Sequence, residues 1–193
     1  MLVKQPPILR VEIGGCFEKG ELLSMEYIFR KAEKQDVEEV VSLYKAAVAH
    51  MIEINILQWD EIYPNEEVLS GDIDKGELYL LTNEKMITAC VVINEEQEEA
   101  YLPAPWRYNT GRSAVIHRLC VHPSAQGTGI GKQMMKYSEE LIQSNGYESI
   151  RLDTFSNNRF ARRLYESLGY TYVGEVTFRK GLFYLMEKNF VSQ

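Results

Sequence analysis

Three alternating glycines are the feature of this chain with the clearest chemical potential. Gly127, Gly129 and Gly131 lie between an expected strand and an expected helix, and Lys132 follows them directly. Glycine lets the backbone approach a bulky ligand and adopt conformations closed to other residues. The first turn of a helix has unpaired N–H groups and a partial positive charge, which together favour a phosphate. An ordinary glycine-rich turn is the simpler alternative, but the strand before and the helix after the glycines favour a phosphate site.

Two familiar phosphate-binding loops fit this segment poorly. A Walker A loop needs Ser or Thr after its Gly-Lys pair, where this chain has Gln133. A dinucleotide-binding loop needs G-x-G-x-x-G near the start of its fold, whereas these glycines read G-x-G-x-G two-thirds along the chain. Asp153 does lie about twenty residues further on, so a dinucleotide-dependent oxidoreductase stays an alternative. The segment fits the pattern Q/R-x-x-G-x-G/A better than either of these loops, through Gln126, Gly129 and Gly131.

The elements around this loop predict a mixed α/β arrangement with one central sheet. A helix is expected from Asp36, which forms a capping box with Glu39, and a short second helix over residues 66–73. Apolar periodicity and turn residues give the remaining elements in the order β-α-α-β-β-β-α-β-α-β-β. The expected strands are the run at Tyr27–Phe29, Leu78–Thr82, Met86–Ile93, Ala114–Val121, Ser149–Phe155, Tyr170–Phe178 and Leu182–Met186, with further helices around Ile130–Leu141 and Ala161–Leu168.

Composition and charge narrow the function classes. The chain has 193 residues, 45% of them hydrophobic and 11% aromatic, which predicts a folded globular domain. Its 21 Lys and Arg against 28 Asp and Glu give a net charge of −7, which disfavours nucleic acid and favours a cationic or amine-bearing partner. The apolar stretches are far shorter than the ~20 residues that cross a bilayer, so no membrane segment is expected. An odd, sparse set of three cysteines favours a reducing, cytoplasmic location.

Residues 1–24 differ from the rest of the chain, because Pro6-Pro7, Gly14-Gly15 and Gly20 interrupt any regular period. The codons of Lys19-Gly20-Glu21 can spell a bacterial ribosome-binding site. Three more codons lie between that site and the Met25 codon. Two interpretations stay open. Residues 1–24 are either a translated leader before a natural start at Met25, or an N-terminal arm or extra edge strand. In both, residues 25–193 form the main domain.

Two segments resemble the GNAT superfamily of acyl-CoA-dependent N-acetyltransferases. One is Ile116–Pro123, which leads into the glycine loop. The other is Asn158–Tyr170, which looks like the N-x-x-A-x-x-L-Y-x-x-x-G-[FY] segment of that family. The two motifs occur in the expected order and separation, which is more specific than either motif alone. The resemblance extends from about Tyr27 to Phe190.

The resemblance implies an α/β single-domain GNAT fold. Its sheet would be mixed and mostly antiparallel, with helices on both faces, and would split between residues 114–121 and 149–155, where acyl-CoA enters. The implied reaction is direct transfer of an acetyl group from acetyl-CoA to a primary amine of a small molecule or peptide, in a ternary complex without a metal. A homodimer is compatible with the family. The alternative is a non-catalytic acyl-CoA-binding regulatory module, which would keep the glycine loop and lose the catalytic acid.

The resemblance also assigns the cofactor contacts. Main-chain groups of Leu119 and Val121 would hydrogen-bond the pantetheine arm, amides from Gly127 to Lys132 would hold the pyrophosphate, and Asn158 would touch the pantetheine or its thioester end. The whole cofactor-binding set is Leu119, Cys120, Val121, Gln126, Gly127, Thr128, Gly129, Ile130, Gly131, Lys132 and Asn158.

Tyr165 and His117 are the expected catalytic residues. By resemblance Tyr165 protonates the departing CoA thiolate, and a phenol with a pKa near ~10 is protonated at neutral pH. His117 matches a histidine of aralkylamine N-acetyltransferases and would help to deprotonate the amine; a strand histidine without a role is the alternative. Odd spacing on a strand places Cys120 and His122 on the face opposite His117, which argues against a metal site. Cys120 could attack a thioester only if a bulge turned it toward the CoA sulfur.

The expected acceptor site is built from aromatic and acidic residues, a combination that suits a cationic amine. Simple packing is the alternative for the aromatic members, and for Trp59 in particular. The candidates follow the first helix or precede the central strand: Trp59, Asp60, Glu61, Tyr63, Trp106, Arg107 and Tyr108.

Overall fold

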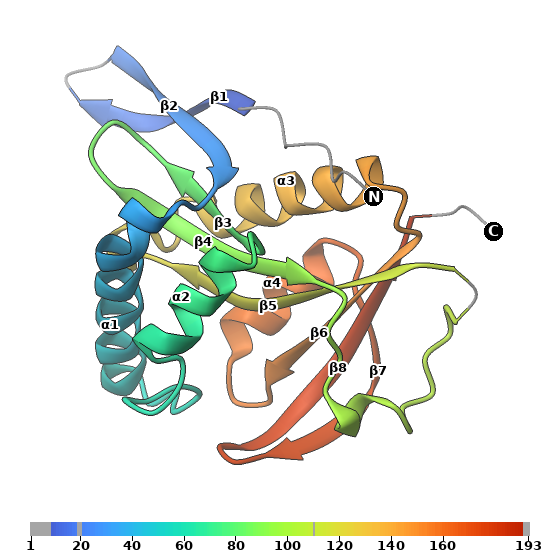
Figure 1. Ribbon diagram of the computed structural model, residues 1–193. Helices are drawn as coiled ribbons and strands as arrows, with labels where there is room; N and C mark the ends of the chain where they lie inside the picture. Colours follow the sequence, from blue (N-terminus) through green and yellow to red (C-terminus); the bar gives the residue numbers. More distant parts are fainter. Residues whose placement is uncertain (1–8, 19–20, 110, 191–193) are drawn as a thin grey trace.

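One eight-stranded sheet runs through residues 9–18, 21–109 and 111–190, the part of the chain that the computed structural model describes (Figure 1). The strands lie in the order β1-β2-β3-β4-β5-β6-β8-β7, and only the neighbours β5 and β6 are parallel. The expected mixed, mostly antiparallel sheet is therefore confirmed. Its strands are β1 (Leu9–Glu18), β2 (Glu21–Lys31), β3 (Leu78–Thr82), β4 (Ile87–Asn94), β5 (Ser113–Val121), β6 (Ser149–Phe155), β7 (Thr171–Phe178) and β8 (Gly181–Asn189).

Helices cover both faces of the sheet, as the resemblance implied (Figure 1). Helices α1 (Val37–Glu53) and α2 (Glu66–Asp74) bury their apolar residues against one face. Helix α3 (Ile130–Ser144) packs on the other face, where α4 (Arg159–Ser167) contributes Tyr165 to the same apolar cluster. None of the helices within the described ranges combines the length and apolar character needed to cross a membrane.

The sheet splits between its two parallel strands. Pairing of β5 with β6 runs only from Ser113 with Ser149 to Ile116 with Leu152. Beyond that point β5 continues to Val121 and β6 to Phe155 without pairing to each other. Backbone groups on the facing edges of both strands are therefore left for a ligand.

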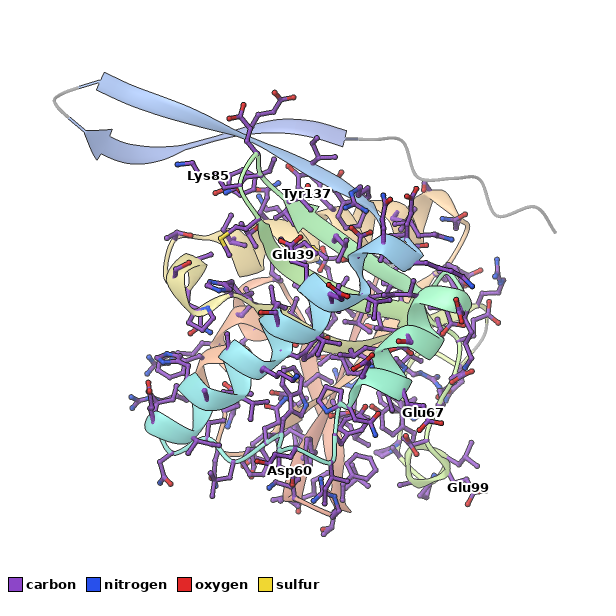
Figure 2. The ribbon with its side chains drawn as sticks, turned by 60° about the vertical axis from the view of Figure 1, so that its left-hand side comes forward. Glu39, Asp60, Glu67, Lys85, Glu99 and Tyr137 are labelled. Carbon is purple, nitrogen blue, oxygen red and sulfur yellow. The ribbon has the colours of Figure 1, made fainter. Side chains whose placement is uncertain are left out.

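The expected capping box is wrong by one turn. The reciprocal bonds join Glu33 and Asp36 at a short 3-10 turn, and α1 begins after it at Val37. The guanidinium of Arg30 donates two hydrogen bonds of 2.7 Å to the Asp36 carboxylate. The Glu39 carboxylate instead accepts a 2.6 Å hydrogen bond from the backbone N–H of Ile87, and so ties α1 to β4 (Figure 2). Both carboxylates thus have tertiary partners that a local pattern does not reveal.

The N-terminal segment forms a hairpin at the edge of the sheet (Figure 1). Strand β1 pairs only with β2, and β2 begins to pair with β3 at Ile28. Residues 1–8 and 19–20 lie outside the described residues. The choice between a leader that ends before Met25 and a structural arm stays a prediction.

Candidate active site

A cleft of about 1020 Å³ opens where β5 and β6 separate. Its walls come from the end of α1 and the segment after it, the glycine loop, the start of α4, and the turn between β7 and β8. Eleven of the thirteen predicted catalytic and cofactor-binding residues line it: His117, Leu119, Cys120, Val121, Gln126, Gly127, Gly129, Gly131, Lys132, Asn158 and Tyr165. The side chain of Ile130 lies instead in the core, and the Thr128 hydroxyl donates to the Ala125 carbonyl at 2.7 Å.

The glycine loop presents free backbone amides to this cleft. Gly127 and Gly129 have φ angles of 77° and 92°, a left-handed region that favours glycine. Gly129 is the N-cap of α3, and the first helical bond runs from Gln133 N–H to its carbonyl at 3.0 Å. The amides of residues 130–132 therefore precede the helical ladder and stay available to an anion. A Cβ atom on Gly127 or Gly129 would meet no atom within 4 Å, so the surface there is open.

Gly131 has a different role in the same loop. A Cβ atom there would lie 3.4 Å from the side chain of Val121 and 3.5 Å from that of Leu164. A methyl group there would make ordinary contacts with β5 and α4, and the Gly131 N–H remains one of the free amides. Gln126 holds the start of the loop, because its side-chain amide donates to the Val121 carbonyl at 3.1 Å.

A β-bulge at Arg118 overturns the predicted alternation along β5. Cys120 pairs with Cys90 and His117 pairs with Val92, so Val91 opposes two residues of β5. Because directly paired residues share a face, His117 and Cys120 lie on the same side of the sheet, not on opposite sides as predicted. The described residues contain no group of three His, Cys, Asp or Glu side chains that could hold a metal ion.

Arg118 is a functional-site residue that sequence reasoning missed. Its φ of 54° is unusual for a residue with a side chain. Its guanidinium donates to the Tyr63 hydroxyl and to the Asp72 carboxylate, both at 2.7 Å, and its carbonyl accepts from the Tyr44 hydroxyl. Helices α1 and α2 thus hold the bulge in place. The only available signal was an arginine in a strand of mostly apolar residues.

His117 is a neutral imidazole in this site. Its Nε2 lies 3.0 Å from the side-chain oxygen of Asn94 and 3.1 Å from the carbonyl of Glu96. Both partners are acceptors, so Nε2 carries the proton and Nδ1 has the lone pair. Burial, and secondarily the charge of Arg118, lower the pKa of His117 to about 4. The imidazole is therefore a weak base at neutral pH.

Tyr165 and Asn158 enter the cleft from α4. The side-chain oxygen of Asn158 caps this helix by accepting from Ala161 N–H at 3.0 Å, and its amide nitrogen donates to Gln58 at 3.0 Å. Tyr165 is only 5% exposed, yet it lines the cleft. Burial, and then the carboxylate of Asp153, raise the pKa of the Tyr165 phenol. Tyr165 is therefore protonated at neutral pH and able to donate.

The expected acceptor residues separate into two groups. Trp59 and Tyr63 line the cleft, and Trp59 also packs on Tyr44 with ring centroids 5.2 Å apart. Asp60 is occupied, because Arg179 donates to it at 2.8 and 2.9 Å and Lys180 at 3.2 Å, close to the β7–β8 hairpin (Figure 2). The remaining candidates, Glu61, Trp106, Arg107 and Tyr108, do not line the cleft.

Comparison with known proteins identifies the fold and the family. Residues 48–170 match the acetyltransferase (GNAT) family. The mycothiol acetyltransferase of Beutenbergia cavernae is 28% identical over 81 residues, which are 42% of this chain and only 27% of that protein. A GNAT acetyltransferase from Streptococcus agalactiae superposes with a TM-score of 0.76 at 21% identity, over 86% of this chain and 96% of that chain.

A Salmonella typhimurium protein that was solved with its cofactor acetyl-CoA superposes with a TM-score of 0.64 at 17% identity. The superposition covers 86% of this chain and 95% of the Salmonella typhimurium chain. The family match spans well over half of the chain and includes the glycine loop, the bulged strand and α4. The chain therefore belongs to the acetyltransferase (GNAT) family.

Proposed function

We propose that the protein is an N-acetyltransferase that transfers the acetyl group of acetyl-CoA to a primary amine of a small molecule or peptide. The observation that carries this proposal is a single cleft with free helix amides at one end and a protonated, buried tyrosine, Tyr165, beside the strand split. Family membership supports acyl transfer, and the acetyl-CoA in the Salmonella typhimurium structure supports the donor.

The residues of the cleft fit a CoA thioester along its length. The amides of residues 130–132 suit the pyrophosphate, and the open surface at Gly127 and Gly129 leaves room for it. The unpaired stretch of β5 at residues 119–121 can hydrogen-bond the pantetheine amides as an added strand would. Asn158 is assigned to the pantetheine or its thioester end. Within the described residues its amide nitrogen donates one hydrogen bond, to Gln58, which leaves its second proton for the ligand.

The chemistry follows from direct attack in a ternary complex. The amine forms a bond to the thioester carbonyl carbon, and a main-chain amide at residues 119–121 stabilises the oxyanion. The carbon–sulfur bond then breaks, and Tyr165 donates its proton to the thiolate. The ammonium loses two protons overall, of which one ends on sulfur and one goes to solvent.

Two other functions were compatible with the sequence. A dinucleotide-dependent oxidoreductase is set aside by membership of the GNAT family. A non-catalytic acyl-CoA-binding module remains the competing proposal, and Tyr165 in the cleft wall argues against it.

Ligand-induced stabilisation tests the donor site. CoA and acetyl-CoA are expected to raise the melting temperature, because they bind the native state only, and NAD is expected to leave it unchanged. Equal shifts from CoA and NAD, or no shift from CoA, would remove the glycine loop from the proposed function.

A further inference from the structure

Asp153 occupies the position on β6 where the sheet begins to split. Ile116 and Leu152 are the last residues of β5 and β6 to pair, so His117 and Asp153 are the first residues on either side of the gap. The side chains of Ile116 and Leu152 both pack in the core beneath α3. Because side chains alternate along a strand, His117 and Asp153 both face the opposite side, which α1 covers. Both line the cleft.

The Asp153 carboxylate is held so that one oxygen is fixed and one is available. The hydroxyl of Tyr101, a fully buried residue, donates to Oδ2. Tyr101 is itself anchored, because Trp106 Nε1 donates to its carbonyl at 2.9 Å. Within the described residues Oδ1 accepts no hydrogen bond, and it is not a fully buried atom. A buried tyrosine therefore fixes one oxygen of a carboxylate that lines the cleft, and the other oxygen is left for a ligand.

The surroundings of Asp153 and His117 make the carboxylate a stronger base than the imidazole, the reverse of their usual order. Burial, and then Glu98 near Tyr101, raise the pKa of Asp153 to about 6, against the opposing effects of Tyr101 and Arg118. The pKa of His117 is lowered to about 4. The same carboxylate raises the pKa of Tyr165 on α4, and Asp153 pairs with the uncharged Leu185 on β8. At neutral pH Asp153 is the anion and the better proton acceptor, whereas His117 is neutral.

We propose that Asp153 binds the ammonium group of the acceptor and takes its first proton, with Tyr101 as its positioning residue. The inference rests on the proposed N-acetyltransferase function. The ammonium transfers one proton to Asp153 Oδ1, which leaves a neutral amine and a neutral carboxyl. The amine nitrogen then bonds to the thioester carbon, its second proton passes to water as the carbon–sulfur bond breaks, and Tyr165 protonates the sulfur. Solvent removes the proton from Asp153 and restores that of Tyr165.

The pH dependence of kcat/KM for the amine tests this assignment. The probe is the best substrate among benzylamine, putrescine and a dipeptide with a free N-terminus. The wild type is expected to lose activity below about pH 6 and to stay level from there to the pKa of the amine, because it uses ionised Asp153 and the ammonium. Asp153→Asn must use the free amine. Its kcat/KM is expected to fall by about 10²-fold at pH 7 and to rise about tenfold per pH unit.

Three further variants make the result specific. Tyr101→Phe removes a hydrogen bond that stabilises the anion, so the acid limb is expected to move to higher pH. His117→Gln is expected to retain the level region and the acid limb. Glu67 is an exposed carboxylate on α2 outside the cleft (Figure 2), and Glu67→Gln is the matched control. It is expected to leave the pH profile of kcat/KM unchanged.

Binding of acetyl-CoA separates a local effect from a folding defect. The melting-temperature shift that acetyl-CoA induces is expected to be equal in the wild type and Asp153→Asn. The assignment would be overturned if kcat/KM of Asp153→Asn kept the level region, or if kcat/KM of His117→Gln lost it. The proposed function would stand in both cases. A wild type that releases no CoA thiol with any of the three amines would overturn the proposed function and this inference with it.

Discussion

At the scale of single residues, Tyr165 is the group on which the leaving thiolate depends. Tyr165→Phe removes one hydroxyl and keeps the ring that packs against Tyr170, so the fold should be retained. We expect kcat to fall by about 10²-fold and the affinity for acetyl-CoA to stay nearly constant, because the lost interaction acts in the transition state. Steady-state kinetics under conditions where chemistry limits the rate give the measurement. Unaltered turnover would remove Tyr165 from the mechanism.

The buried carboxylate of Asp153 also has a consequence for stability. Its pKa is raised to about 6 in the folded protein, above the ordinary value near ~3.9. The folded state therefore binds this proton more tightly, so stability falls as the pH rises between these values and the full cost is present above pH 6. Asp153→Asn should be more stable than the wild type at pH 7.5, by about 1–3 kcal/mol, with no gain at pH 4. Denaturant unfolding at both values checks this, and a variant less stable at pH 7.5 would contradict it.

At the scale of elements, the junction of β5, the glycine loop and α3 positions the site. Gly131→Asp tests whether this junction binds the pyrophosphate. The substitution causes little backbone strain, because Gly131 lacks the positive φ of Gly127 and Gly129. The added carboxylate lies beside the free amides, and we expect the KM for acetyl-CoA to rise about tenfold or more with the fold retained. Gly131→Ala, which adds a methyl group at ordinary contact distance and no charge, is the control. Equal KM values for the Asp variant and the wild type would place the pyrophosphate elsewhere.

The strands and helices themselves were largely predictable from the sequence. From β2 onward their order matches the apolar periodicity, because each element has one face that only the core can cover. The bulge at Arg118 was not predictable. Arg118 is held by the hydrogen bond it accepts from Tyr44 and those it donates to Tyr63 and Asp72, residues that are 46 to 74 positions away along the chain.

The same reason explains which site residues the sequence revealed. The free amides of the glycine loop depend on the local spacing of its glycines. The sequence alone therefore predicts that loop. Asp60 was expected to face an amine, but it is bound to Arg179 and Lys180, 119 and 120 residues later. For Asp153, the spacing from the glycines suggests only a dinucleotide-binding loop. Its partner Tyr101 is 52 residues earlier along the chain.

At the scale of the whole molecule, the N-terminal hairpin lies at the edge of the sheet. Strand β2 pairs with β3 only from Ile28 onward, and among the described residues the first to line the cleft is Ala47. We expect a chain of residues 25–193 to match the full chain in melting temperature and in acetyl-transfer rate. Marked destabilisation on truncation would show that residues 1–24 are a structural arm.

Direct transfer of acetyl from acetyl-CoA to an amine in this cleft can be measured by following both products in one reaction. The protein is incubated with acetyl-CoA and the amine panel, free thiol is measured, and the amine and the intact protein are analysed by mass spectrometry. We predict one acetylated amine for each CoA thiol released, and a protein that stays unacetylated at Cys120 when the amine is omitted. Binding of CoA without any thiol release, thiol release without an acetylated amine, or acetyl found on Cys120 would contradict the account.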